Sequence, residues 1–133
     1  MEGKRTQGLS STWTSGGVLN KIIYGDNTEG SIEELKNMVG PGWGKIIESL
    51  VPDLFDLGWD GVVLQVKEKF GGLRFYIGCG TDAIFDRINQ SENESYVTCE
   101  DCGAPGKTKT RPGGYWLATL CETCRNKENN GTV

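Results

Sequence analysis

Hydrophobic and polar positions follow different periods in successive parts of the chain. Apolar residues recur at helical spacing in 31–39, 43–57 and 81–95, and they alternate with polar residues in 62–77. From residue 96 onward, cysteines, glycines and short strand-like runs replace these patterns. The order predicts an α+β fold in which helices pack with an antiparallel hairpin and a small cysteine-rich unit follows.

Local signals mark where the predicted helices begin and end. Ser31 stands three residues before Glu34, which is the spacing of a capping box, and Pro41 follows the end of that first helix. Pro52 lies inside the second helical pattern and predicts a kink or two short helices there. Thr81 is a good N-cap for the third helix.

The two ends of the chain lack a clear hydrophobic period. Residues 1–17 are rich in Gly, Ser and Thr, whereas VLNKIIY that follows is apolar enough to dock as a short strand or a helical turn. The predicted organisation is a mobile arm at 1–30, an α+β core with the hairpin at 31–98, a cysteine-rich ribbon at 99–125 and a disordered tail at 126–133.

The motif KEKFGGLRFY predicts the hairpin turn, with Gly71 and Gly72 as its two central residues. The predicted register pairs Phe70 with Leu73, Lys69 with Arg74, Glu68 with Phe75, Lys67 with Tyr76 and Val66 with Ile77. One face then carries Leu64, Val66, Phe70, Leu73, Phe75 and Ile77, with Glu68 as the exception, and the other carries Gln65, Lys67, Lys69, Arg74 and Tyr76.

The polar face of this hairpin concentrates positive charge. Lys69 directly opposite Arg74 costs stability unless a negative group lies between them. Two explanations stay open: a solvated face with Glu68, Asp60 or another carboxylate nearby, or an anion site with phosphate as the anion and an aromatic ring stacking a base. The candidate ligand-binding residues are Lys67, Lys69, Gly71, Gly72, Arg74 and Tyr76.

Composition narrows the function classes. The 133-residue chain has a formal net charge of −4 and no histidine, which excludes imidazole metal ligands and histidine-based proton relays. An acidic chain is a poor general nucleic-acid binder. No apolar run approaches a membrane span and no secretory signal is evident, so a cytoplasmic protein is expected. A non-catalytic protein is also expected.

Four of the five cysteines have the spacing of a metal site. Cys99 and Cys102 form one C-x2-C pair, and Cys121 and Cys124 form a second pair after 18 intervening residues. This pattern predicts one structural Zn²⁺ in a closed four-thiolate shell, with disulfides or unbridged buried thiols as the alternative. Cys79 is left over and is expected to be a buried apolar residue.

The stretch from Gly40 to Lys127 resembles a widespread family of small phage and prophage proteins. The resemblance rests on Gly-Pro-Gly-Trp before a helix, on VLQVKEKFGGLRFYI and on TCEDCGAPG…GGYWLATLCETC. It implies one α+β domain with an integral zinc ribbon and no catalytic activity. A further association, through size, phage origin and the cationic hairpin, is with the anti-CBASS sponges that sequester cyclic-nucleotide signals of bacterial defence.

Three functions follow from these features. The first is a homo-oligomeric binder that sequesters a phosphorylated small molecule, above all a cyclic dinucleotide, with Trp43 or Trp116 as further stacking residues. The second is a protein-interaction adaptor that docks through Tyr115, Trp116 and Leu117. The third, disfavoured by the acidic total, is nucleic-acid binding through the basic segment 107–111.

Overall fold

A computed structural model describes residues 14–15, 18–111 and 114–131 and confirms the α+β class. The strands are β1 (Thr14–Ser15), β2 (Val18–Leu19), β3 (Ile22–Tyr24), β4 (Glu29–Gly30), β5 (Val62–Lys69), β6 (Gly72–Ile77), β7 (Lys107–Thr110) and β8 (Leu117–Leu120). The helices are α1 (Ile32–Lys36), the 3₁₀ turn η1 (Pro41–Trp43), α2 (Gly44–Asp56), α3 (Asp82–Ser95) and α4 (Glu122–Gly131).

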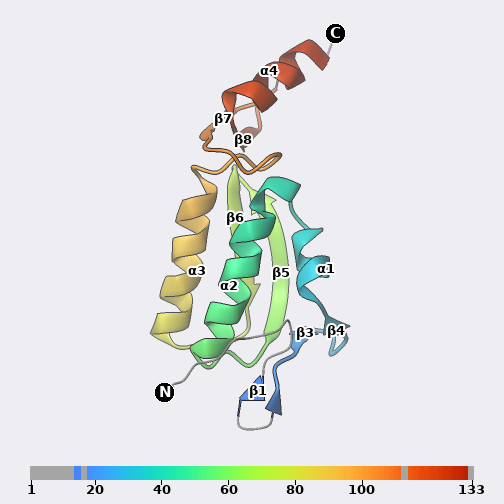
Figure 1. Cartoon of the computed structure of the whole chain (residues 1–133), viewed down its shortest axis with the longest axis vertical. Helices are drawn as coiled ribbons and strands as arrows, with labels where there is room; N and C mark the ends of the chain where they lie inside the picture. Colours follow the sequence, from blue (N-terminus) through green and yellow to red (C-terminus); the bar gives the residue numbers. More distant parts are fainter. Residues whose placement is uncertain (1–13, 16–17, 112–113, 132–133) are drawn as a thin grey trace.

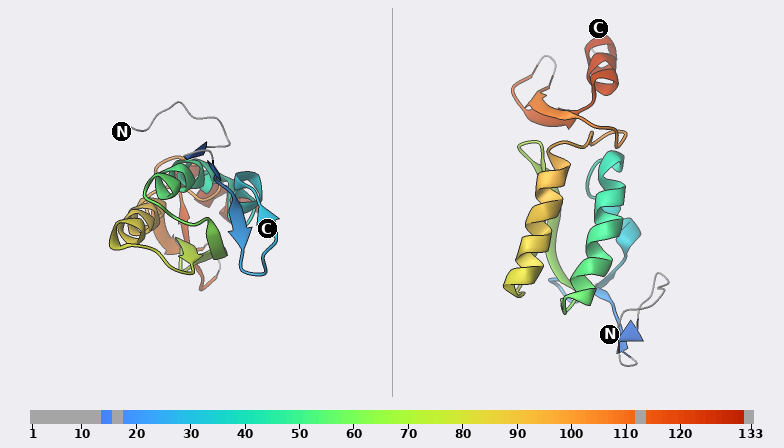
Figure 2. Two further views of the ribbon diagram at one scale, coloured as in Figure 1. Left: turned by 90° about the horizontal axis from the view of Figure 1, so that it is seen from below. Right: turned by 60° about the vertical axis from the view of Figure 1, so that its left-hand side comes forward.

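A four-stranded mixed sheet forms the centre of the molecule, with strand order β4-β3-β5-β6. Strand β3 runs parallel to β5, and the other neighbours are antiparallel. Helices α2 and α3 lie side by side against one face of the β5–β6 hairpin, and the β7–β8 ribbon with α4 stands beyond one end of these helices (Figures 1 and 2). None of the described helices has the length and apolar character that crossing a membrane requires.

One apolar core fills the space between the sheet and the helices. Its largest fully buried side chain is Trp43, and Trp59 packs edge-on against Phe75 with ring centroids 5.9 Å apart. The buried members are Ile22, Leu35, Trp43, Ile46, Ile47, Leu50, Val51, Leu54, Trp59, Val63, Val66, Leu73, Phe75, Ile77, Ile84 and Ile88. Most of them come from the predicted apolar faces of the helices and the hairpin, whereas Ile22 lies on β3 and Trp59 lies between α2 and β5.

The predicted helix starts are confirmed. The Ser31 hydroxyl accepts a hydrogen bond from the N–H of Glu34 at 3.1 Å, and the Thr81 hydroxyl caps α3 in the same way. The division at Pro52 is wrong, because α2 is a single helix through that residue. Pro52 removes only one helical hydrogen bond, and the completely buried side chains of Leu50 and Leu54 hold the turns on both sides.

Both predicted chain ends need correction. Strands β3 and β4 belong to the central sheet, so the ordered domain begins within the segment 1–30 that was predicted as an arm. Residues 1–13 and 16–17 lie outside the described residues. At the other end, residues 126–131 continue α4 rather than forming a disordered tail, because the helix starts directly after Cys121 and is anchored at the cysteine cluster.

The predicted hairpin register is wrong by one turn position. The central turn residues are Phe70 and Gly71, with φ of 56° and 82°, as a type I′ turn requires, and Gly72 already belongs to β6. Arg74 therefore faces Lys67 rather than Lys69. The other observed pairs are Lys69 with Gly72, Glu68 with Leu73, Val66 with Phe75, Gln65 with Tyr76 and, across a bulge, Val63 with Ile77.

The predicted faces nevertheless hold for most of the hairpin. Moving the turn by one position changes every pairing by two residues, and a shift of two leaves each side chain on its original face. Val66 and Phe75 point into the core, and Tyr76 points away from it. Two residues expected on the apolar face are exceptions. Leu64 is 57% exposed because the bulge between Val63 and Gln65 changes the alternation there, and Phe70 is 56% exposed because it lies in the turn.

Candidate metal centre and the surfaces around it

The sulfur atoms of Cys99, Cys102, Cys121 and Cys124 lie within 4.8 Å of one another. The first pair sits in a tight turn in which Gly103 has a φ of 87° and donates its N–H to the Cys99 carbonyl at 2.9 Å. The second pair precedes and begins α4. None of the cysteines forms a disulfide. The two C-x2-C pairs thus bring together four sulfur ligands that could hold one metal ion, as their spacing predicted.

The pKa shifts of the thiols in this cluster favour the binding of a cation. Burial acts to raise the pKa of the Cys99 thiol, but the backbone N–H groups around it and the Cys102 thiol lower that pKa to about 7. The pKa of Cys124 is raised, chiefly by its interaction with the Cys121 thiol. Four adjacent thiolates repel one another, so ionising all of them requires a positive ion between them.

The segment Gly40–Trp43 packs directly against the turn that holds Cys99 and Cys102. The N–H of Gly42 donates to the carbonyl of Glu100 at 2.7 Å, and the Trp43 indole donates to the carbonyl of Thr98 at 2.9 Å. A Cβ atom on Gly42 would lie 2.0 Å from the Cys99 carbonyl oxygen, so only glycine allows this approach. The helical core is therefore in direct contact with the metal-binding loop.

Glu100 is a buried carboxylate inside this junction that the sequence reasoning missed. One of its oxygens accepts from the N–H of Thr119 at 3.0 Å, and the other accepts from the Arg111 guanidinium at 3.1 Å. Burial raises the pKa of Glu100, while Thr119 and Arg111 oppose the rise. An acidic residue directly after the first cysteine was the only signal in the sequence.

The glycine pair of the hairpin is buried by the chain itself. The hydroxyl of Thr119 donates to the carbonyl of Gly71 at 2.6 Å, and the N–H of Gly71 donates to the Glu68 carboxylate at 2.7 Å. A Cβ on Gly72 would lie 2.5 Å from the ring of Tyr96. Both glycines thus allow close approach of the ribbon and of Tyr96, and neither offers the open phosphate-binding turn that the sequence predicted.

Arg74 has a carboxylate partner. Its guanidinium contacts Glu92 at 2.6 Å and the Tyr96 hydroxyl at 3.0 Å, so the carboxylate expected near the hairpin comes from α3 rather than from Glu68 or Asp60. Lys67 and Lys69 have no ion pair within the described residues, and Lys69 lies over the Phe70 ring at 5.4 Å. Tyr76 is 42% exposed on the same sheet face.

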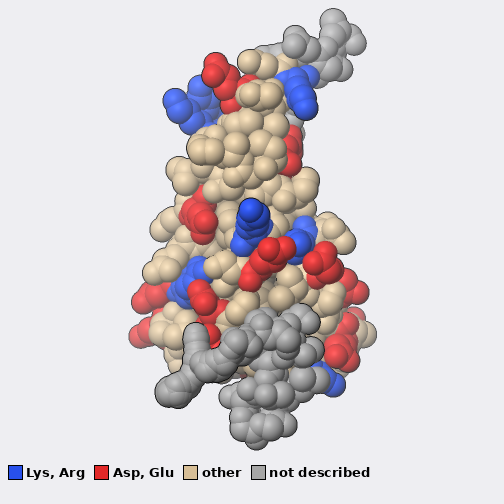
Figure 3. All heavy atoms as spheres, viewed as in Figure 1, with Lys and Arg blue, Asp and Glu red and all other residues tan. Residues whose placement is uncertain are grey.

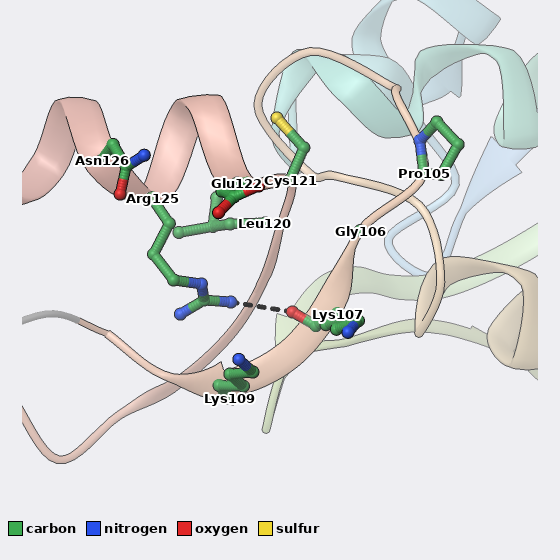
Figure 4. A pocket seen from close by; sticks show the side chains of 9 residues that line it. All are labelled: Pro105, Gly106, Lys107, Lys109, Leu120, Cys121, Glu122, Arg125 and Asn126. Atoms are coloured by element: carbon green, nitrogen blue, oxygen red, sulfur yellow. Dashed lines mark hydrogen bonds between the residues drawn. The ribbon is translucent and has the colours of Figure 1, made fainter.

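A pocket of about 440 Å³ lies between β7 and α4, on the ribbon face opposite the hairpin (Figure 4). Lys107 and Lys109 line it from β7, and Arg125 and Glu122 line it from α4. The Arg125 guanidinium donates to the carbonyls of Thr110 and Lys107 at 2.9 and 2.8 Å, which ties α4 to the strand. Among the side chains that the structure describes, three cations and one carboxylate therefore line the pocket.

Two aromatic side chains are exposed at the ribbon end. Tyr115 is 96% and Trp116 is 76% exposed. The Arg111 N–H donates to the Trp116 carbonyl at 2.7 Å, which continues the β7–β8 ladder by one pair. The alternation along that ladder places residue 116 on the face of Lys109, the face that also carries the pocket.

The fifth cysteine, Cys79, is exposed, so its expected burial is wrong.

No family model, curated protein or solved structure matches the chain. Its function is therefore inferred from the residues themselves.

Proposed function

We propose that the protein is a non-catalytic, zinc-stabilised binding protein whose ligand is a phosphorylated small molecule held in the pocket between β7 and α4. The observation that carries the proposal is the lining of that pocket, where the described side chains include three cations, Lys107, Lys109 and Arg125, and one carboxylate, Glu122. This local excess of positive charge lies in a chain whose formal net charge is −4.

Zinc is the metal that the donor set favours. Four cysteine sulfurs and no oxygen or nitrogen ligand match a tetrahedral structural zinc site, and such a shell leaves no position for a catalytic water. The ion would stabilise the ribbon. Through the hydrogen bonds from Gly42 to Glu100 and from Thr119 to Gly71, it would also stabilise the neighbouring helical core.

The size and charge of the pocket support a phosphate-bearing ligand. Its volume falls in the range of small-molecule sites, about 300–1,000 Å³. Neither lysine is neutralised by an ion pair within the described residues, so both ammonium groups remain to bind phosphate oxygens. Trp116, exposed on the same ribbon face, supplies an aromatic ring on which a base can stack.

A cyclic dinucleotide is the ligand class to test first. It combines two phosphates with two bases, which matches the combination of cations and an aromatic ring around the pocket. The resemblance to small phage proteins adds a setting, in which the protein sequesters such a signal in the bacterial cytoplasm. The competing explanation is that these cations only offset the charge of about −2 on four thiolates and one zinc ion.

Thermal unfolding with a matched pair of double variants tests the proposal. We expect a cyclic dinucleotide to raise the melting temperature of the zinc-loaded wild type and of the variant Lys67→Gln/Lys69→Gln. The same ligand should leave the melting temperature of Lys107→Gln/Lys109→Gln unchanged. Both variants remove two positive charges from alternate positions of one strand, so only the location differs. Titrations with a mononucleotide and a single-stranded oligonucleotide separate small ligands from nucleic acid.

The outcomes are distinct. Loss of the shift in Lys67→Gln/Lys69→Gln alone would return the ligand to the hairpin, where the sequence predicted it. Absence of a shift across a panel of cyclic dinucleotides and nucleotides would overturn the proposal and leave the pocket cations as partners of the thiolates.

A protein-interaction adaptor is the second candidate function, and the exposure of Tyr115 and Trp116 favours it. Large aromatic side chains this open to solvent contribute nothing to the ribbon core. A protein that shows no nucleotide response, and whose stability is unchanged by Tyr115→Ser/Trp116→Ser, would favour this function over ligand binding.

A further inference from the structure

Phe70 occupies a backbone conformation that its side chain disfavours. It is the first central residue of the type I′ hairpin turn, with a φ of 56°, a position that favours asparagine or glycine. Its side chain is 56% exposed, and the one ring contact within the described residues is the Lys69 ammonium group at 5.4 Å. Packing within the chain therefore gives little in return for the strain, which points to a contact outside the chain.

The surroundings of Phe70 define the chemistry of that contact. Lys67 and Lys69 precede it on β5, and no carboxylate of the described residues pairs with either lysine. The charge of Arg74, opposite Lys67, is already matched by Glu92. A surface that fits this hairpin end is therefore apolar where it meets the phenyl ring and carries carboxylates around it.

The chain itself has such a surface at the opposite end of its helical core. Leu57 and Phe85 are each 41% exposed, and they lie where α2 ends and α3 begins (Figure 1). Asp82 and Asp86 are one turn apart on α3, are exposed and have no ion pair within the described part of the chain. Carboxylates gather along the lower edges of the helical core in Figure 3.

We propose that copies of this chain associate head to tail, with Phe70 and Lys69 of one copy seated on the acidic end of α3 in the next. A head-to-tail contact between these two patches is heterologous and builds rings or open chains. Opposite charges across the contact make it weaken as salt concentration rises. This surface is distinct from the ligand pocket, and the proposal does not depend on ligand binding.

Light scattering and sedimentation velocity of the zinc-loaded full chain over a range of concentrations test the proposal. We expect association by the wild type at low salt, and none by Phe70→Asn, which also melts at a higher temperature because its Asn-Gly turn relieves the strain. Lys69→Glu and Asp86→Lys should each abolish association. The double variant Lys69→Glu/Asp86→Lys restores opposite charges across the contact and should associate again.

Met38→Asn is the matched control, since Met38 is an exposed apolar residue that belongs to neither patch and its replacement should leave association unchanged. A wild type that stays monomeric at every concentration would overturn the proposal and leave Phe70 to a different protein. Association that survives Phe70→Asn, or a charge-swapped double variant that stays monomeric, would also overturn it.

Discussion

Arg74→Ala is the most informative substitution in the hairpin, because the two explanations of its charge predict opposite signs. If Arg74 and its cationic neighbours formed an empty anion site, removing the arginine would relieve repulsion and leave the protein no less stable. In the structure, however, the guanidinium contacts Glu92 at 2.6 Å and the Tyr96 hydroxyl at 3.0 Å. The substitution should therefore break a network that stabilises the folded state.

The magnitude follows from the exposure of the pair. The side chains of Arg74 and Glu92 are 21% and 27% exposed, so their pair lies between a surface salt bridge, worth about 0–1 kcal/mol, and a buried one, whose disruption costs about 3–5 kcal/mol. An intermediate value of about 2 kcal/mol, with about 1 kcal/mol for the hydrogen bond to Tyr96, gives a loss of about 3 kcal/mol.

Two effects act in the opposite direction. The Nε atom of Arg74 is buried and has no hydrogen-bond partner among the described residues, and removing it recovers about 1 kcal/mol. Relief of the repulsion from Lys67, directly opposite on β5, recovers a further few tenths, about 0.3 kcal/mol. The net expectation is a destabilisation of about 1.7 kcal/mol, so the lost network outweighs the relieved repulsion.

Urea unfolding of the zinc-loaded protein measures this change in the free energy of unfolding. Lys67→Ala, which removes the paired cation on the neighbouring strand, is the control and should change stability by less than about 0.5 kcal/mol. A double-mutant cycle with Glu92→Ala should give a coupling energy of about 1–2 kcal/mol. An Arg74→Ala protein as stable as the wild type, or more stable, would refute the assignment of Glu92 as its partner.

Two further predictions concern the metal centre and the glycine pair. Purified protein should contain one zinc ion per chain by elemental analysis. The variant Cys99→Ser should lose the metal and the ordered ribbon, which would lower its melting temperature and reduce its circular-dichroism signal. Full folding of the protein without metal would contradict this prediction. Gly72→Ala should destabilise by about 1–3 kcal/mol because its Cβ would overlap the Tyr96 ring, whereas Gly78→Ala, which meets nothing within 4 Å, should be nearly neutral in the same urea assay.

Features that depend on neighbouring residues could be predicted from the sequence. The caps at Ser31 and Thr81 involve hydrogen bonds three residues away, and the two C-x2-C pairs each fit one tight turn. The alternation of Val66 and Phe75 into the core follows from the strand period, which tolerates a turn shifted by one position. Each of these predictions needs only local geometry, and each is confirmed.

Features that depend on distant partners could not be predicted. The turn was placed at Gly71 and Gly72 because a glycine pair between two strand-like runs favours a two-residue turn, but Glu68 and Thr119 hold Gly71 as the second rather than the first central residue. The partner of Arg74 comes from a helix 18 residues later, and the spacing of charges along β5 and β6 gives no information about it. The pocket requires α4, whose residues 126–131 the composition assigned to a disordered tail.

The glycines show why motif reasoning favoured a ligand at the hairpin. A glycine permits close approach of another group, and the sequence does not distinguish a phosphate from a backbone carbonyl or an aromatic ring of the same chain. In this protein Gly42, Gly71 and Gly72 all receive parts of the segment 96–119 that surrounds the metal centre. Their shared role is to join the ribbon to the helical core, so the charged groups left without internal partners, on β7 and at the hairpin end, are where binding should be sought.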